Sequence, residues 1–189
     1  KGVQTQCMAY SDDGVIFHKY ALNPVIAEPP EGNSEDFRDP KVFFAEGCWN
    51  MVVGGSIGGA GNGGDGRIYL YRSEDLLKWE FAGTVLASDG KLGTMFECPD
   101  MYEMDGKWIV TCSPMYHPGG NKALYCVGSM DFEKCRYETE KTGFLDYGPD
   151  FYAAQSCLDQ YGKRIMIAWQ NGWEWMPWCT GQGPSGKEG

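Results

Sequence analysis

The sequence has few basic residues and almost no histidine. Lys and Arg total 16 against 26 Asp and Glu, the formal net charge is -10, and only two histidines occur. Binding to a nucleic-acid backbone requires clustered Lys and Arg, and the sequence contains no basic run. We therefore expect no nucleic-acid partner. The acidity suits a pocket of carboxylates around a neutral or weakly charged ligand.

Long apolar runs and paired cysteines are also missing. No segment approaches the roughly 18 apolar residues of a membrane-spanning helix, so no membrane partner is expected. The eight cysteines form no Cys-x-x-Cys pair and have no histidine at ligand spacing, which argues against zinc, and we expect no metal or other cofactor. Several stand beside apolar strand-like runs, where a reduced cysteine acts as a small hydrophobe. This favours a reducing compartment such as the cytoplasm.

Glycine and aromatic residues are abundant instead. The chain has 27 glycines, 14% aromatic and 42% hydrophobic residues among its 189 positions. Short apolar runs alternate with turn residues, a pattern typical of β-strands joined by hairpins. Runs such as those at 108–112 and 164–169 predict strands buried on both faces. We expect an all-β chain that forms one domain, with helix as a minor element at most.

An internal repeat runs through the chain. Residues 9–17 resemble residues 71–79 and, more faintly, the segment that starts at 127. The three segments share a serine followed two positions later by an aspartate, at Ser11 and Asp13, Ser73 and Asp75, and Ser129 and Asp131. This divides the chain into approximate repeats at 9–70, 71–126 and 127–189.

Each repeat also contains a turn with an acidic residue and a proline. Pro40, Pro99 and Pro149 are 59 and 50 residues apart, which lies within the range of a four-stranded propeller blade. Within one period we expect four strands, at about 37–45, 49–55, 67–72 and 78–83. A β-sandwich would not explain this period, so the repeat favours a β-propeller.

Three carboxylates occupy near-equivalent positions in the repeats. Asp39, Glu97 and Asp150 each stand next to a proline turn, so they should face one central pocket. Clustered carboxylates repel one another, which raises the pKa of at least one and makes it a proton donor. Such a pair of carboxyl groups is used in glycoside hydrolysis, and such a cluster could also bind calcium. The spacing alone leaves both uses open.

Three motifs resemble those of the family 32 glycoside hydrolases, which include invertases, sucrose-6-phosphate hydrolases, inulinases and levanases. They are Phe37-Arg-Asp-Pro40, Glu97-Cys-Pro-Asp100 and Asp146-Tyr-Gly-Pro-Asp-Phe-Tyr-Ala-Ala-Gln155. The resemblance covers about residues 6–173. It implies a five-bladed β-propeller, of which this chain would hold about three to three and a half blades, and a parent protein that is a retaining β-fructosidase.

The resemblance also implies roles for single residues. Glu97 would be the general acid/base, and Asp39 would bind fructose hydroxyls and stabilise the transition state. Arg38 would shape the same subsite, and Cys98 would support Glu97. Asp150 and Tyr152 would line the pocket.

The sequence departs from the family pattern at the nucleophile. The family places this aspartate in a Trp-x-Asn-Asp-Pro-Asn-Gly motif on the first blade, and this chain contains no such motif. We therefore expect a central fragment without the first blade and the trailing β-sandwich, inactive alone and prone to self-association through open sheet edges. Two alternatives remain, a non-catalytic sugar-binding propeller and an inverting, arabinanase-like five-bladed enzyme.

Overall fold

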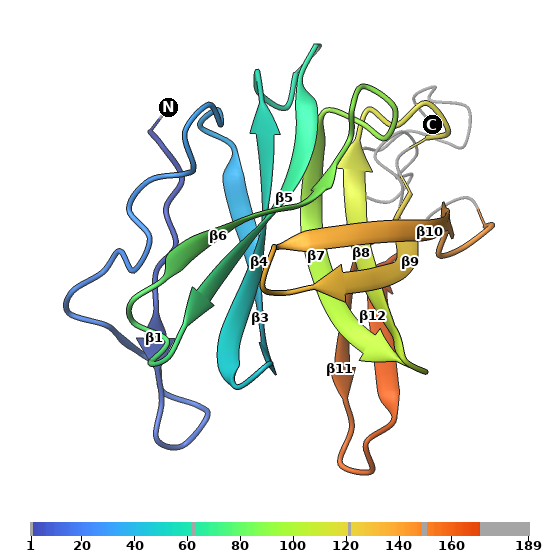
Figure 1. Cartoon of the computed structure of the whole chain (residues 1–189). Coiled ribbons are helices and arrows are strands. Elements are labelled where there is room, and N and C mark those ends of the chain that lie inside the picture. The colour runs from blue at the N-terminus through green and yellow to red at the C-terminus, as the bar shows by residue number, and fades with distance from the viewer. Residues whose placement is uncertain (1, 62, 121, 149–150, 171–189) are drawn as a thin grey trace, which may run out of the picture.

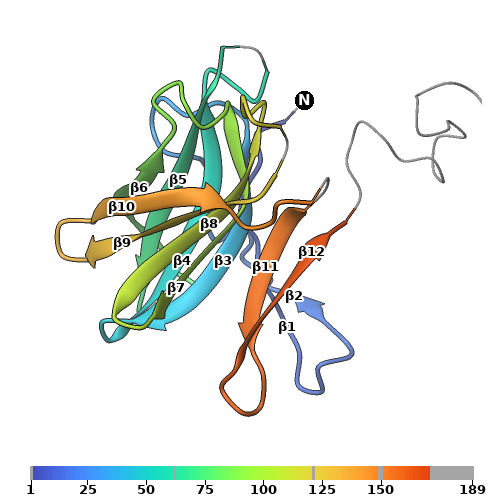
Figure 2. The same ribbon diagram turned by 90° about the vertical axis from the view of Figure 1, so that its right-hand side faces the viewer.

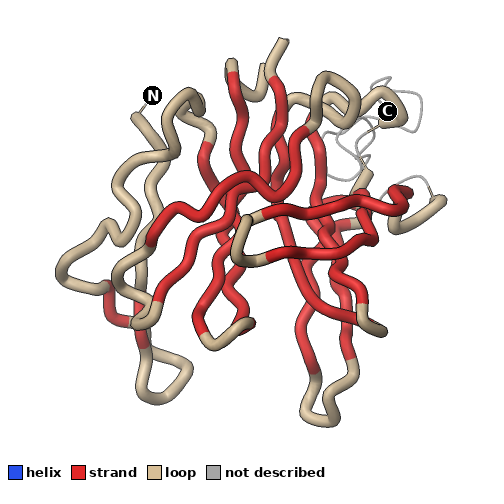
Figure 3. Tube along the Cα trace, in the orientation of Figure 1, coloured by secondary structure: helices blue, strands red, loops and turns tan. Residues whose placement is uncertain are grey.

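The chain is all-β in the part that the structure describes. A computed structural model describes residues 2–61, 63–120, 122–148 and 151–170, and these contain strands, turns and loops but no helix (Figure 3). Accordingly, none of the described residues forms a helix that could cross a membrane.

Two four-stranded antiparallel sheets form the body of the molecule (Figure 1). In each sheet the strands follow one another in sequence order, as a meander. The first sheet contains β3 (Phe37–Ala45), β4 (Cys48–Ile57), β5 (Asp65–Ser73) and β6 (Glu80–Ala87). The second contains β7 (Met95–Met104), β8 (Lys107–Met115), β9 (Leu124–Asp131) and β10 (Arg136–Phe144). The four strands predicted for one period therefore match the first sheet in order and approximate position.

Two further pairs of strands accompany these sheets. They are the short pair β1 (Ala9–Tyr10) and β2 (His18–Lys19), and the longer pair β11 (Tyr152–Leu158) and β12 (Arg164–Trp169). Figure 2 shows β11 and β12 beside the second sheet, with β11 facing β7 and β3. The first strands of three successive units, β3, β7 and β11, thus come together on the inside.

Apolar side chains fill the space between the two four-stranded sheets. Ile68 and Leu70 of β5 meet Phe96 and Val110 of the second sheet in one buried cluster, all less than 2% exposed. Trp108 packs at the margin of this cluster against Phe43 of the first sheet and Phe132 after β9. These contacts confirm the expectation that Trp108 packs between sheets. Stacked sheets of this kind are stabilised mainly by apolar burial.

The prediction that residues 164–169 are buried on both faces was wrong. Exposure alternates along β12, and Ile165, Ile167 and Trp169 are 41%, 71% and 54% exposed. The reason is that no further sheet packs over this face in the described part of the chain. Alternating apolar residues thus mark the strand correctly but do not report what covers it.

The repeated serine and aspartate build the same turn each time. Between β5 and β6, Ser73 Oγ accepts the Leu76 amide at 2.8 Å, and Asp75 accepts the amides of Leu77 and Lys78, both at 2.9 Å. Ser11 and Asp13 bond the chain between β1 and β2 in the same pattern. These side chains replace lost backbone partners, which explains why the two residue types recur at fixed spacing.

Candidate active site

The inner strands β3, β7 and β11 share an irregularity at the same place. The pairing register shifts between Arg38 and Lys41, between Glu97 and Asp100, and between Tyr152 and Gln155. In each case the first residue of the bulge has a positive φ: 60° at Asp39, 48° at Cys98 and 54° at Ala153. Bulges of this type redirect side chains and occur often beside functional sites.

This register corrects the alignment expected from the prolines. Arg38, Glu97 and Tyr152 are the true equivalents, so Asp39 is one position out of register with Glu97. The third bulge carries Ala153 and Ala154 and no proline. A bulge residue tolerates proline because it makes no regular ladder hydrogen bond, but it does not require one. Asp150, the third predicted carboxylate, lies outside the described residues.

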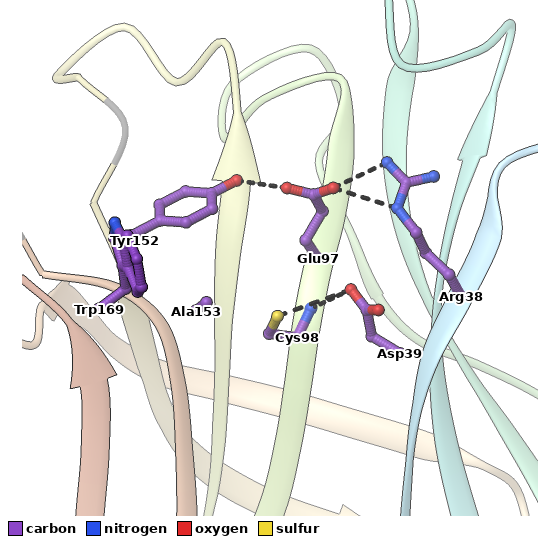
Figure 4. Close-up of a pocket in the computed structure, with 7 residues that line it drawn as sticks. All are labelled: Arg38, Asp39, Glu97, Cys98, Tyr152, Ala153 and Trp169. Carbon is purple, nitrogen blue, oxygen red and sulfur yellow. Dashed lines mark hydrogen bonds and ion pairs between the residues drawn. The ribbon is translucent and has the colours of Figure 1, made fainter. Parts of the chain in front are cut away.

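Glu97 is held on both sides of its carboxylate (Figure 4). Arg38 donates to Oε1 from Nε at 3.1 Å and from Nη2 at 2.8 Å, and the Tyr152 hydroxyl donates to Oε2 at 2.5 Å. Burial, followed by the contact with Glu97, raises the pKa of Tyr152 far above its usual range, so the phenol stays a donor. The equivalent residues of three units thus meet at one carboxylate.

Asp39 faces Cys98, its equivalent on the next sheet. Asp39 Oδ2 accepts the Cys98 amide at 2.9 Å, and the thiol lies 3.6 Å from the same oxygen. Burial, with a contribution from Asp39, raises the pKa of Cys98 to about 12, so it is a neutral thiol near pH 7. The backbone of the second bulge therefore fixes the Asp39 carboxylate beside Glu97.

Residues outside the predicted set hold Arg38 in place. Asp36 accepts from Arg38 Nη1 at 2.7 Å, and Gln4 accepts from the same nitrogen at 3.2 Å. Asp36 also accepts the Ala60 amide at 2.8 Å, which ties the glycine-rich loop to the site. Sequence reasoning missed Asp36, although its position two residues before Arg38, on the same face of an extended chain, was a usable signal.

A cavity of about 410 Å³ opens over these groups. The described residues that line it are Arg38, Asp39, Glu97, Cys98, Tyr152, Ala153 and Trp169. A space of this size accommodates a small organic ligand such as a sugar. Trp169 was not predicted to be here. Its half-exposed indole forms one wall, and aromatic faces of this kind stack on sugar rings.

The donor set does not resemble a metal centre. Within the part of the chain that the structure describes, no three His, Cys, Asp or Glu side chains are grouped as metal ligands. Glu97 is instead occupied by the Arg38 guanidinium, at a side-chain exposure of 20% for Glu97 and 22% for Arg38. The charges and the open cavity fit recognition of a polar, uncharged ligand by hydrogen bonds.

Fold and site together define a β-propeller unit with a carboxylate pocket at its inner strands. The family model described as the glycosyl hydrolases family 32 N-terminal domain matches residues 1–180, and the chain belongs to this family. Among solved structures, it superposes on the Bombyx mori GH32 β-fructofuranosidase BmSUC1 in complex with sucrose, with a TM-score of 0.82 and 40% identity. That match covers 92% of this chain and 38% of the other. The prediction of an all-β, five-bladed propeller, of which this chain forms a part, is thereby confirmed.

Relatives of known sequence carry names from the same family. The sucrose-6-phosphate hydrolase of Bacillus subtilis is 35% identical over 175 residues, which are 87% of this chain and 35% of that protein. The levanase of Bacillus subtilis is 37% identical over 194 residues, 93% of this chain and 27% of that protein. The chain therefore spans about a third of the length of the curated relatives that it matches.

Proposed function

We propose that the protein to which this chain belongs is a retaining β-fructosidase that hydrolyses the fructosyl bond of sucrose, sucrose-6-phosphate or fructans. The observation that carries the proposal is Glu97 held between Arg38 and Tyr152 beside Asp39, in a cavity open to a sugar-sized ligand. Family membership supports it, as does the sucrose bound in the complex of the silkworm enzyme.

In the proposed mechanism Glu97 protonates the glycosidic oxygen as the leaving group departs. A second carboxylate, supplied by a segment outside these 189 residues, attacks the anomeric carbon and forms a fructosyl-enzyme intermediate. Glu97 then removes a proton from the water that hydrolyses this intermediate. The donors on both sides of Glu97 fix its orientation, which a proton transfer in the transition state requires.

Asp39 and its neighbours would hold the fructosyl ring. Asp39 Oδ2 is committed to the Cys98 amide, which leaves Oδ1 to accept ring hydroxyls. Positive charge develops on the fructosyl ring in the transition state, and the fixed Asp39 carboxylate would stabilise it. Arg38, Cys98, Tyr152 and Asp150 are the proposed further binding residues, as the family resemblance implies.

Fructose release from sucrose, levan and inulin by the natural protein tests this function. Glu97→Gln should lower kcat by about 10²- to 10⁴-fold, because general acid/base catalysis contributes that much. Glu103→Gln is the matched control, since Glu103 lies on the same strand with an exposed side chain that bonds only the Gly106 amide in the described residues. Full activity of Glu97→Gln would refute the assignment. Sugar binding without hydrolysis by the natural protein would identify a sugar-binding propeller instead.

We also propose that the 189-residue chain self-associates when isolated. Val42 and Phe44 on β3, and Ile165 and Ile167 on β12, present exposed apolar side chains at the two outer faces of the described sheets. Exposed apolar strands pair readily with other copies. Light scattering after size-exclusion chromatography should give a mass above that of the monomer, whereas a monomer at all concentrations would contradict this.

A further inference from the structure

Directly below the three bulges, one side chain from each inner strand joins a shared network. The register makes Lys41, Asp100 and Gln155 equivalent, since each is the first paired residue after its bulge. Lys41 Nζ donates to Asp100 Oδ2 at 3.3 Å, to Gln155 Oε1 at 3.2 Å and to the Ser156 carbonyl at 2.5 Å. One ammonium group therefore links three strands.

Asp100 is the buried centre of this network. Its side chain is 1% exposed, and Oδ2 also accepts the Ser156 amide at 2.8 Å and the Ser156 hydroxyl at 2.6 Å. A buried carboxylate is tolerated only when charge and hydrogen bonds compensate it, which Lys41 and Ser156 do here. An interior apolar residue would pack more simply, so the charge at this position calls for another explanation.

Gln155 connects the network to the backbone of the active-site bulge. Its Nε2 donates to the Cys98 carbonyl at 3.0 Å and to the Pro99 carbonyl at 3.2 Å. Both carbonyls belong to the bulge that follows Glu97. The chain of contacts therefore runs from Asp100 through Lys41 and Gln155 to the residues that flank the proposed acid/base.

We propose that Asp100 is a positioning residue, which acts with Lys41 and Gln155 to hold the Cys98 bulge, and through it Glu97 and Asp39, in their working geometry. We call Lys41, Asp100, Gln155 and Ser156 the Asp100 clamp. Its effect on catalysis rests on the proposed function. Its effect on the bulge is independent of that function.

The bulge needs such a clamp because its conformation is unfavourable. Cys98 and Asp39 have side chains yet adopt left-handed backbone angles, which persist only where surrounding contacts determine them. The Cys98 amide is also the group that fixes Asp39. Release of the clamp would let the bulge relax, and the two carboxylates would lose their mutual placement.

Asp100→Asn is the main test, made in the natural protein. Asn has the same shape, and Asp100 Oδ1 accepts no hydrogen bond from the described residues, so the new amide can take that place. Gln155→Ala is the second variant, at a less buried position where misfolding is not expected. Leu70→Ala, a fully buried core change in the first sheet away from the clamp, is the control for lost stability.

The readout is alkylation by iodoacetamide, resolved by peptide mass spectrometry. We expect the rate at Cys98 to rise at least fivefold in both clamp variants, while Cys112, 2% exposed in the core of the same sheet, stays unreactive. An unchanged rate at Cys98 would overturn the proposal. So would a parallel rise at Cys98 and Cys112, because that pattern means general destabilisation.

Enzyme kinetics provide the second readout. The clamp variants should lower kcat on sucrose at least tenfold with KM nearly unchanged, and Leu70→Ala should leave kcat as it is at a temperature well below its Tm. An unchanged kcat in a variant whose Cys98 is more reactive would overturn the catalytic part. If the natural protein hydrolyses no fructoside, the proposed function fails, and the alkylation result still decides whether the clamp holds the bulge.

Discussion

The bulges of β3 and β7 have the same backbone but opposite chemistry. The first carries Arg38, Asp39 and Pro40, and the second carries Glu97, Cys98 and Pro99 at the same register positions. As a result Arg38 faces Glu97 and Asp39 faces Cys98, each pair bridging two sheets. A repeated backbone thus supplies the geometry, and differences between the repeats supply complementary partners.

The strands paired with these bulges differ in a related way. Arg38 pairs with Gly54, whereas Glu97 pairs with Ser113. Gly54 lies against the Phe96 backbone of the second sheet, while the Ser113 hydroxyl accepts the Ala153 amide at 2.8 Å. The first junction between units thus depends on close backbone approach, and the second on a hydrogen bond.

Asp39→Asn should have the largest effect among changes at the bulges. It removes the negative charge proposed to stabilise the transition state, and we expect kcat on sucrose to fall by about 10²- to 10³-fold, typical of a lost electrostatic group. Cys98→Ser, the equivalent position on β7, keeps the amide that fixes Asp39 and should cost less than about tenfold. Equal losses at both positions would mean that the two bulges do not differ in function.

Gly54→Ala should be the most destabilising change at the junctions. The added Cβ would overlap the Phe96 carbonyl oxygen, and backbone cannot move aside cheaply. We expect the free energy of unfolding to fall by about 3 kcal/mol, at the upper end for overpacking. Gly61→Ala is the control, because open space surrounds that position. Urea denaturation measures both, and similar values for the two variants would contradict the close approach.

Ser113→Ala should have a smaller effect at the second junction. It leaves the Ala153 amide without its hydroxyl partner, and we expect a loss of about 1 kcal/mol in the free energy of unfolding. Ser113→Thr keeps the hydroxyl and serves as the matched variant. Urea denaturation of both decides the point, since equal losses would show that the hydroxyl contributes nothing.

Ala153→Gly should have the smallest effect, with a sign that tests the bulge itself. Glycine relieves the left-handed backbone at φ 54° but increases the entropy of the unfolded chain, so stability should change by less than about 0.5 kcal/mol. Ala154→Gly, next in the chain and without a positive φ, should lose about 1 kcal/mol. A larger loss at Ala153 than at Ala154, measured by thermal unfolding, would contradict the bulge geometry.

Local patterns made much of this fold predictable. The Ser and Asp of each turn act within a few residues, and the period of the proline turns gave the four strands of the first sheet. The catalytic candidates followed from motifs near Asp39 and Glu97. The division at 9–70, 71–126 and 127–189 stays a prediction.

Contacts between units were not predictable in the same way. Asp36 and the pairing of Lys41 with Asp100 depend on strand register, and a single proline misaligned the third unit by several residues. Trp169 lines the cavity only because β12 lies uncovered beside it in the described part of the chain. Burial and register arise from packing, which sequence periodicity does not report.

The repeated serine and aspartate turns have a consequence for the order of folding. Their hydrogen bonds join residues two or three positions apart, so each hairpin can close locally and fast. The bonds from Arg38 and Tyr152 to Glu97 span 59 and 55 residues. Contacts of such long sequence separation form slowly, and only after neighbouring sheets have docked. The hairpins should therefore gain early protection from hydrogen exchange, and the pocket should be among the last parts of the molecule to become native.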